Sequence, residues 1–276
     1  MEKTMRVKTC LAVAAFAAAS LCDADAANPE NGITAHRGDS AHYPQNSLEA
    51  FAAANEIGAD WIETDVHLTR DGILVISHNA TTKDYCSRDL RIGEHTYAEL
   101  CELDMAETFR AHRMLTLEQR PKLRIARLDE VLDLILKAKK ARLSIQPKCA
   151  CVDQAIALVR RKGAVEWVGF NDISLELMSR VKELEPSIPV FWDRYDDFDV
   201  DKDIATAKAR GFETIMVCYR LATHENVKKM HDAGLKVGVW TVNDPKSLAA
   251  FLDMGVDRIY TDDPQTLKDI MASRCR

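Results

Sequence analysis

The feature that most constrains the fold is a regular alternation of short apolar runs with longer helical patterns, which continues from Gly32 to the C-terminus. The runs are rich in Val, Ile, Phe and Trp, and this composition favours buried β-strands. A series of strand-then-helix units predicts an α/β fold of the TIM (β/α)8 barrel class, with a doubly wound open sheet as the alternative. The eight expected strands are 32–36, 61–66 with a continuation at 73–78, 142–146, 165–170, 190–193, 214–218, 236–241 and 258–261.

The helical patterns between these strands commonly end at Gly or Pro, as helices in globular domains do. Residues 80–126 break the alternation, because this segment is long, charged and poorly periodic. We interpret it as a small insertion after the second strand, at the barrel face whose loops shape active sites. The expected helices are 46–57, 128–140, 152–161, 174–184, 201–210, 223–233, 244–254 and 264–272.

The composition is that of an ordinary globular chain, since 47% of the 276 residues are hydrophobic and 29% are charged. The net charge of -6 gives no reason to expect nucleic acid as a partner. We therefore expect a small-molecule substrate, no nucleic acid and no stable membrane insertion. The sequence leaves the oligomeric state open.

The first 26 residues have the pattern of a secretory signal peptide. Basic residues precede an alanine-rich apolar run at 10–21, and Ala24-Asp-Ala26 fits the small-x-small cleavage rule. We expect cleavage near Ala26, which leaves residues 27–276 as one exported domain, periplasmic or extracellular. Lipidation at Cys22 is the less favoured alternative.

Six cysteines follow the signal peptide, and an even number in an exported chain is compatible with disulfides. The favoured pair is Cys86 with Cys101, because the two residues flank one short excursion. Cys149 and Cys151 are either two buried thiols or a strained pair. Their spacing is not that of a zinc site.

Residues suited to phosphodiester cleavage follow the first two strands. His36 and Arg37 end the first strand, Glu63 and Asp65 lie two apart on the second, and His78 ends its continuation. Two such carboxylates point the same way and can hold a divalent cation. An arginine binds phosphate through two hydrogen bonds, and two histidines can act as general base and general acid.

Further polar and aromatic residues end later strands. Gln146 and Lys148 follow the third strand, and Trp240 ends the seventh. In a parallel barrel the carboxyl ends of all strands meet at one face, so we expect these side chains to join the first cluster.

These motifs resemble the glycerophosphodiester phosphodiesterase family. The resemblance implies a TIM barrel with a small insertion after the second strand. It also implies metal-assisted hydrolysis of glycerophosphodiesters, which are deacylated phospholipids, to glycerol phosphate and an alcohol. The matching segments are 35–38 (AHRG), 44–50 (PQNSLEA), 58–66 (GADWIETDV), 69–72 (TRDG), 77–78 (SH), 239–243 (VWTVN), 255–257 (GVD) and 261–264 (TDDP).

The same resemblance implies a role for each candidate residue. A divalent cation, Mg²⁺ or Ca²⁺, is expected as the cofactor, because all-oxygen ligands favour hard ions over zinc. The sequence does not decide which histidine is acid and which is base, and we take His36 as the base as a working hypothesis. The implied roles are catalytic for His36 and His78, phosphate or substrate binding for Arg37, Lys148 and Trp240, and metal binding for Glu63, Asp65 and Gln146.

Two positions depart from the family pattern, which usually has Glu at Gln146 and Asp at Asn79. Glutamine can still bind a hard cation through its carbonyl oxygen, but its neutrality should lower the affinity. Asn79 can still hydrogen-bond, but it gives the second histidine no charge support. Asp193, after the fifth strand, is either a replacement carboxylate or a turn or helix-cap residue.

We therefore predict an exported, metal-dependent phosphodiesterase. One alternative is phospholipase-D-like hydrolysis of lysolipids, with an apolar entrance built from Met105, Phe109 and Met114. The other is a degenerate barrel that binds a phosphorylated ligand without hydrolysing it, which rests on Gln146 and Asn79 alone.

Overall fold

A computed structural model describes residues 32–274 of the chain. Eight parallel strands close into a barrel, because β1 pairs with both β9 and β2. The predicted TIM barrel is therefore confirmed, and the predicted signal peptide, the Cys22 alternative and Cys275 lie outside the described residues. The strands are β1 (Gly32–Ala35), β2 (Trp61–Leu68), β3 (Leu74–Ile76), β4 (Arg142–Pro147), β5 (Val168–Asp172), β6 (Val190–Arg194), β7 (Thr214–Cys218), β8 (Lys236–Trp240) and β9 (Arg258–Thr261).

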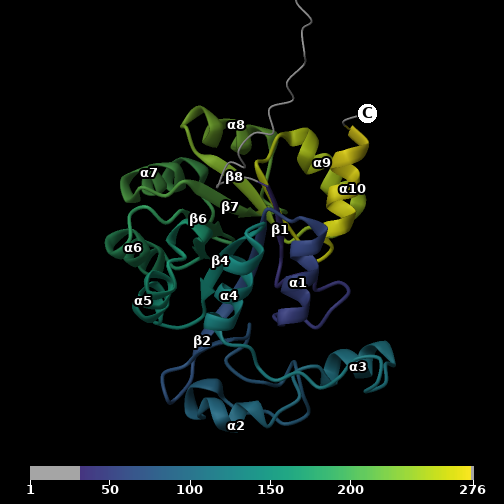
Figure 1. The fold of residues 1–276 in the computed structure, drawn as a ribbon. Coiled ribbons are helices and arrows are strands. Elements are labelled where there is room, and N and C mark those ends of the chain that lie inside the picture. The colour runs from purple at the N-terminus through teal and green to yellow at the C-terminus, as the bar shows by residue number, and fades with distance from the viewer. Residues whose placement is uncertain (1–31, 275–276) are drawn as a thin grey trace, which may run out of the picture.

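Helices alternate with the barrel strands and surround them, while α2 and α3 lie in a separate lobe near the end of β2 (Figure 1). Several predicted helices begin one or two residues late, because Ser174, Thr223 and Asp244 are N-caps whose side chains accept backbone N–H groups. In the part of the chain that is described, no helix is long and apolar enough to cross a bilayer. The surrounding helices are α1 (Leu48–Ile57), α4 (Leu128–Ala138), α5 (Val152–Lys162), α6 (Leu175–Leu184), α7 (Val200–Arg210), α8 (His224–Asp232), α9 (Pro245–Met254) and α10 (Pro264–Arg274).

The sequence predicts that residues 73–78 continue the second strand, but in the structure they do not. They contain β3, which pairs antiparallel with β2 after a turn at Gly72, whose φ is +79°. The Ser77 N–H donates to the Asp65 carbonyl at 3.0 Å, so the returning strand places His78 beside the end of β2. The hairpin, rather than a longer strand, brings the second histidine to the barrel mouth.

The predicted start of the fourth barrel strand is also corrected. Val165–Trp167 form a 3-10 turn, and β5 begins only at Val168. The turn follows Gly163, which ends α5 in a left-handed conformation. The apolar residues of this segment pack against the core from a turn, which the apolar pattern does not distinguish from a strand.

The insertion after the second strand is present as predicted. It contains η1 (Ile92–Glu94), α2 (Tyr97–Cys101) and α3 (Glu107–Arg113). A small core of its own, separate from the main one, includes Tyr85, Leu100 and Met105. The segment is fastened to α1 by the ion pair of Arg120 with Glu49 at 2.7 Å, and to the loop after β1 by a hydrogen bond from Arg113 to the Ala41 carbonyl.

The favoured disulfide between Cys86 and Cys101 is wrong, since both residues are free thiols in the structure. The Cys86 thiol is directed to the Arg88 carbonyl at 3.2 Å, which keeps it within its own turn. Cys149 and Cys151 are also free thiols. The insertion is therefore held together by its apolar core and ion pairs in this structure.

The turn after β1 depends on Gly38. Its φ is +83°, and a Cβ there would lie 2.7 Å from the carbonyl carbon of Ala50 in α1. Gly72 has a similar φ of +79°, but a Cβ there would meet no atom within 4 Å. We expect Gly38→Ala to lower the free energy of unfolding by about 3 kcal/mol and Gly72→Ala by about 1 kcal/mol.

Urea denaturation of the two variants and the parent chain measures both losses. Gly72→Ala is the matched control, because it adds the same backbone strain without the close contact. Equal losses in the two variants would contradict the tight packing of the first loop on α1.

Candidate active site

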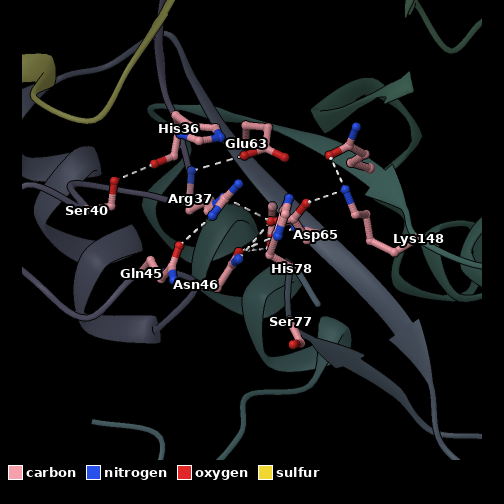
Figure 2. Close-up of polar contacts among 12 residues, drawn as sticks. His36, Arg37, Ser40, Gln45, Asn46, Glu63, Asp65, Ser77, His78 and Lys148 are labelled. Atoms are coloured by element: carbon pink, nitrogen blue, oxygen red, sulfur yellow. Dashed lines mark hydrogen bonds and ion pairs between the residues drawn. The ribbon is translucent and has the colours of Figure 1, made fainter. Parts of the chain in front are cut away.

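The loop after β1 turns sharply and directs two side chains across the barrel mouth. Arg37 has a φ of +57°, and the following N–H of Gly38 donates back to the Ala35 carbonyl at 3.2 Å. The Arg37 guanidinium donates to Gln45 at 2.6 Å (Figure 2). This turn makes His36 and Arg37 neighbours of the two carboxylates on β2.

Asp65 is fully buried, and cationic and amide groups surround its two oxygens (Figure 2). Its Oδ2 accepts from the Asn46 amide at 2.8 Å and lies 3.3 Å from Nε of Arg37. Its Oδ1 lies 3.5 Å from Nζ of Lys148. Burial acts to raise the pKa of Asp65, but the charges of Arg37 and Lys148 hold it below its ordinary value.

Glu63 lies one inward position earlier on β2 and accepts a hydrogen bond from the backbone N–H of Arg37 at 3.0 Å. Burial, followed by repulsion from Asp65, raises the pKa of Glu63 well above its ordinary value. The two carboxylates thus share a buried region in which both are ionised only if further positive charge is present.

His36 is held by Asp262, which comes from the loop after β9. Its Nδ1 lies 2.7 Å from Oδ1 of Asp262, which also accepts from the Ser40 hydroxyl at 3.0 Å. Burial acts to raise the pKa of Asp262, but the hydrogen bond and charge of His36, with the bonds from Asn243 and Ser40, lower it to about 2. Since Nδ1 is occupied, Nε2 is the nitrogen available for proton transfer.

His78 has a similar arrangement with a neutral partner. Its Nδ1 lies 2.7 Å from Oδ1 of Asn79, and the Asn79 amide donates in turn to Asp84. Because that amide group donates to a carboxylate, its oxygen must face the imidazole, and Nδ1 must carry the hydrogen. Burial lowers the pKa of His78, and Tyr85 fixes its backbone N–H.

Gln146 and Lys148 extend from the end of β4 as predicted. Nζ of Lys148 donates to Oε1 of Gln146 at 3.1 Å, and Nε2 of Gln146 donates to Oδ2 of Asp193 at 3.4 Å. The helix-cap interpretation of Asp193 is wrong, because it is an inward residue of β6 and Asp199 caps α7. Burial raises the pKa of Asp193 to about 7.

A cavity of about 290 Å³ lies on the barrel axis at this end. Seven of the eight predicted site residues line it, and Asp65 lies buried beside them. Trp240 forms one wall with Tyr195, whose ring centre is 5.8 Å away. The lining residues are His36, Arg37, Glu63, His78, Gln146, Lys148, Asn171, Ile173, Asp193, Tyr195, Trp240, Thr241 and Tyr260.

A second, larger hollow of about 830 Å³ lies between the loop after β1 and the insertion. It shares only His36 and Arg37 with the axial cavity. Met105 and Phe109 line it, whereas Met114 is 91% exposed and is not among its lining residues. The apolar entrance expected from all three residues is therefore built by two of them.

Sequence reasoning missed three partners of the site, Asn46, Asp262 and Tyr195. Asn46 and Asp262 lie inside motifs that were recognised, but their side-chain partners are far away in sequence. The position of Asp262 directly after the last strand was an available signal, because that end of every strand faces the site.

Among residues 32–274 no group of three or more His, Cys, Asp and Glu side chains is arranged to hold a metal. A cation here would need the carbonyl oxygen of Gln146 beside Glu63 and Asp65. The arrangement as a whole places two imidazoles, a guanidinium and an ammonium around one cavity. Such a set can bind a phosphodiester and move protons to and from its oxygens.

Comparison with known proteins gives a consistent result. The sequence model of the glycerophosphoryl diester phosphodiesterase family matches residues 36–266. A glycerophosphodiester phosphodiesterase from Caldanaerobacter subterraneus subsp. tengcongensis is 28% identical over 87% of this chain and 97% of its own. Another from Bacillus subtilis is 25% identical over 86% of this chain and 85% of its own.

A solved structure is also similar. The crystal structure of a glycerophosphodiester phosphodiesterase from Parabacteroides distasonis has a TM-score of 0.74 and 26% identity. The match covers 90% of this chain and 99% of that one.

The ion pair between His36 and Asp262 predicts a pH-dependent contribution to stability. The pKa of Asp262 is lowered from an ordinary 3.8 to about 2, so its ionised form stabilises the folded state above about pH 4. This stabilisation disappears as the pH falls from about 4 towards 2. We expect Asp262→Asn to lower the free energy of unfolding by about 1 kcal/mol near neutral pH, because solvent screens the partly exposed carboxyl.

Urea denaturation at about pH 6 and about pH 3 measures this effect, and the loss should shrink at the lower pH. Asp269→Asn, at an exposed position of α10, is the control and should change little at either pH. A loss that grows on acidification would refute the assignment.

Proposed function

Because the chain belongs to the glycerophosphoryl diester phosphodiesterase family, we propose that it is an exported, cation-assisted enzyme that cleaves glycerophosphodiesters to glycerol phosphate and an alcohol. Membership makes the chain a phosphoric diester hydrolase with glycerophosphodiester phosphodiesterase activity. The cation, the roles of the individual residues and the export are the parts that we propose.

The convergence of His36, His78, Arg37 and Lys148 on one cavity carries this proposal. Each imidazole has Nδ1 occupied by an acceptor, which leaves both Nε2 atoms for chemistry. A barrel that only binds a phosphorylated ligand has no need of two histidines oriented in this way. Asn79, which favoured that alternative, still orients His78.

The charges of the site favour a divalent cation. Four buried acidic groups, Glu63, Asp65, Asp172 and Asp193, all interact electrostatically with the ammonium of Lys148. Burial and then repulsion from Asp65 raise the pKa of Glu63, so additional positive charge there would favour its ionised form. Oδ1 of Asp65 is buried and accepts no hydrogen bond, and its one charged contact is with Lys148 at 3.5 Å, so it keeps lone pairs that can bind a cation.

We propose that Glu63, Asp65 and the carbonyl oxygen of Gln146 hold Mg²⁺ or Ca²⁺, since such oxygen donors suit hard cations. The cation, when bound, would neutralise negative charge on the phosphate. Arg37 and Lys148 bind phosphate oxygens, with the guanidinium offering two donors and the ammonium a compact charge.

The partners of the two histidines distinguish their roles. The carboxylate of Asp262 lies 2.7 Å from Nδ1 of His36, and this charged partner suits the group that gives its Nε2 proton to the leaving alcohol oxygen. His78 has a neutral partner and a lowered pKa, which suits the group that accepts the proton of the attacking hydroxyl on Nε2. These partners favour the reverse of the working hypothesis from sequence. The attacking hydroxyl belongs either to water or to the substrate itself, with a cyclic phosphate as the first product in the second case.

The two hollows suit the two arms of a diester. The axial cavity of about 290 Å³ has room for a glycerol group beside the phosphate, and the larger hollow has room for the alcohol. Met105 and Phe109 in the larger hollow favour lysolipids as a second candidate substrate class. Hydrolysis of glycerophosphocholine and of lysophosphatidylcholine should be compared, with Phe109→Asp expected to impair only the second.

The export rests on the sequence of the first 26 residues and is tested by N-terminal sequencing of the secreted protein.

Turnover of glycerophosphocholine by alanine variants tests the proton-transfer roles. We expect His36→Ala and His78→Ala each to lower turnover by about a hundredfold or more. His42→Ala is the matched control, because His42 is exposed and pairs with Asp39 outside the axial cavity. Near-parental turnover in either active-site variant would remove that histidine from the mechanism.

Removal of divalent ions tests the cation. We expect a chelator to abolish turnover and Mg²⁺ or Ca²⁺ to restore it. Glu63→Gln should require a cation concentration at least about tenfold higher, because one anionic ligand is lost. Full turnover in excess chelator would exclude a cation from the reaction.

A further inference from the structure

The amide of Gln146 lies between two groups that leave it a single orientation. Nζ of Lys148 is 3.1 Å from Oε1, and an ammonium can only donate a hydrogen bond. Oδ2 of Asp193 is 3.4 Å from Nε2 and accepts from it. Rotating the amide by half a turn would set two donors together on one side and two acceptors on the other.

Asp193 is itself held in place from the neighbouring strand. The Asn171 amide donates to the same Oδ2 at 3.2 Å, and the Ser144 hydroxyl donates to Oδ1 of Asn171 at 2.7 Å. Asp193 is only 6% exposed. The chain of bonds from Ser144 through Asn171 and Asp193 therefore ends on the Gln146 amide.

We propose that Asp193 is a positioning residue that keeps the carbonyl oxygen of Gln146 turned towards Asp65 and the cation. This inference rests on the proposed function, because it concerns the cation of that site. A carboxylate ligand offers two equivalent oxygens and needs no such partner. An amide offers one oxygen and one NH₂ group, and the NH₂ group repels a cation, so a glutamine ligand needs an acceptor behind its nitrogen.

The pairing makes the two positions interdependent. With Gln146→Glu, two carboxylates would stand where an amide and a carboxylate now form a hydrogen bond, and their repulsion would oppose ionisation. Adding Asp193→Asn would restore a hydrogen bond in the opposite direction, with the new amide at position 193 donating to the new carboxylate at position 146. The double variant should therefore bind a cation better than Gln146→Glu alone.

Calorimetric titration of the whole mature protein with Ca²⁺ and with Mg²⁺ tests the inference, with turnover as a second readout. We expect Asp193→Leu, which leaves the Gln146 nitrogen without an acceptor, to weaken cation binding about tenfold or more, because residues that hydrogen-bond metal ligands have effects of this size. Gln146→Glu should also bind poorly, and Gln146→Glu with Asp193→Asn should return to within about threefold of the parent chain.

Asp172→Asn is the charge-matched control. Asp172 also interacts with Gln146 and Lys148, but its Oδ1 accepts the Ser174 N–H at 2.8 Å and it does not line the axial cavity. Its loss should weaken binding by less than about threefold. An equal loss in both variants would show that charge, rather than orientation, is what Asp193 provides, and would overturn the inference.

Two further outcomes separate this inference from the proposed function. Parental cation affinity in Asp193→Leu, or no recovery in the double variant, would refute the positioning role and leave the cation site standing. Absence of cation binding to the parent chain would refute both. Thermal unfolding without cation checks that each variant folds, and if Asp193→Leu does not, the comparison of Gln146→Glu with the double variant, which carries the isosteric Asp193→Asn, decides.

Discussion

Asp65 is a fully buried anion, and three side chains from two separate parts of the chain contact its two oxygens. Asn46 and Arg37 reach it from the loop after β1, and Lys148 reaches it from the end of β4. Burying a carboxylate costs free energy unless its oxygens are paired, so the burial of Asp65 depends on these three contacts together. The positions of the phosphate-binding cations therefore follow from the placement of one acidic residue on β2.

The two departures from the family pattern have the same physical compensation. Gln146 has Asp193 behind its amide nitrogen, and Asn79 has Asp84 behind its own. In both cases a carboxylate lies one hydrogen bond further from the reacting atoms, and it fixes which end of the amide faces inward. At both positions the negative charge lies on the hydrogen-bond partner of the amide, and the direction of each hydrogen bond is retained.

The barrel and most of its inward residues could be predicted from the sequence, because strands have a side-chain period of two and parallel strands end at one face. The route of His78 could not be predicted, since an antiparallel return after Gly72 and a longer strand have the same apolar pattern. The hydrogen bond of Asp262 to His36 and that of Asp193 to Gln146 also escaped prediction, although Asp193 was a candidate carboxylate of the site. Their roles depend on strand register and side-chain direction, which bring together residues that lie 226 and 47 positions apart.

The axial cavity and the hollow under the insertion have only His36 and Arg37 in common. A diester bound across this junction is divided at its phosphorus, so cleavage leaves one fragment in each compartment. In this proposed binding mode neither fragment occupies the space of the other. The insertion, which packs on a core of its own, lines the compartment for the alcohol, so its sequence can change to suit a different alcohol without disturbing the barrel.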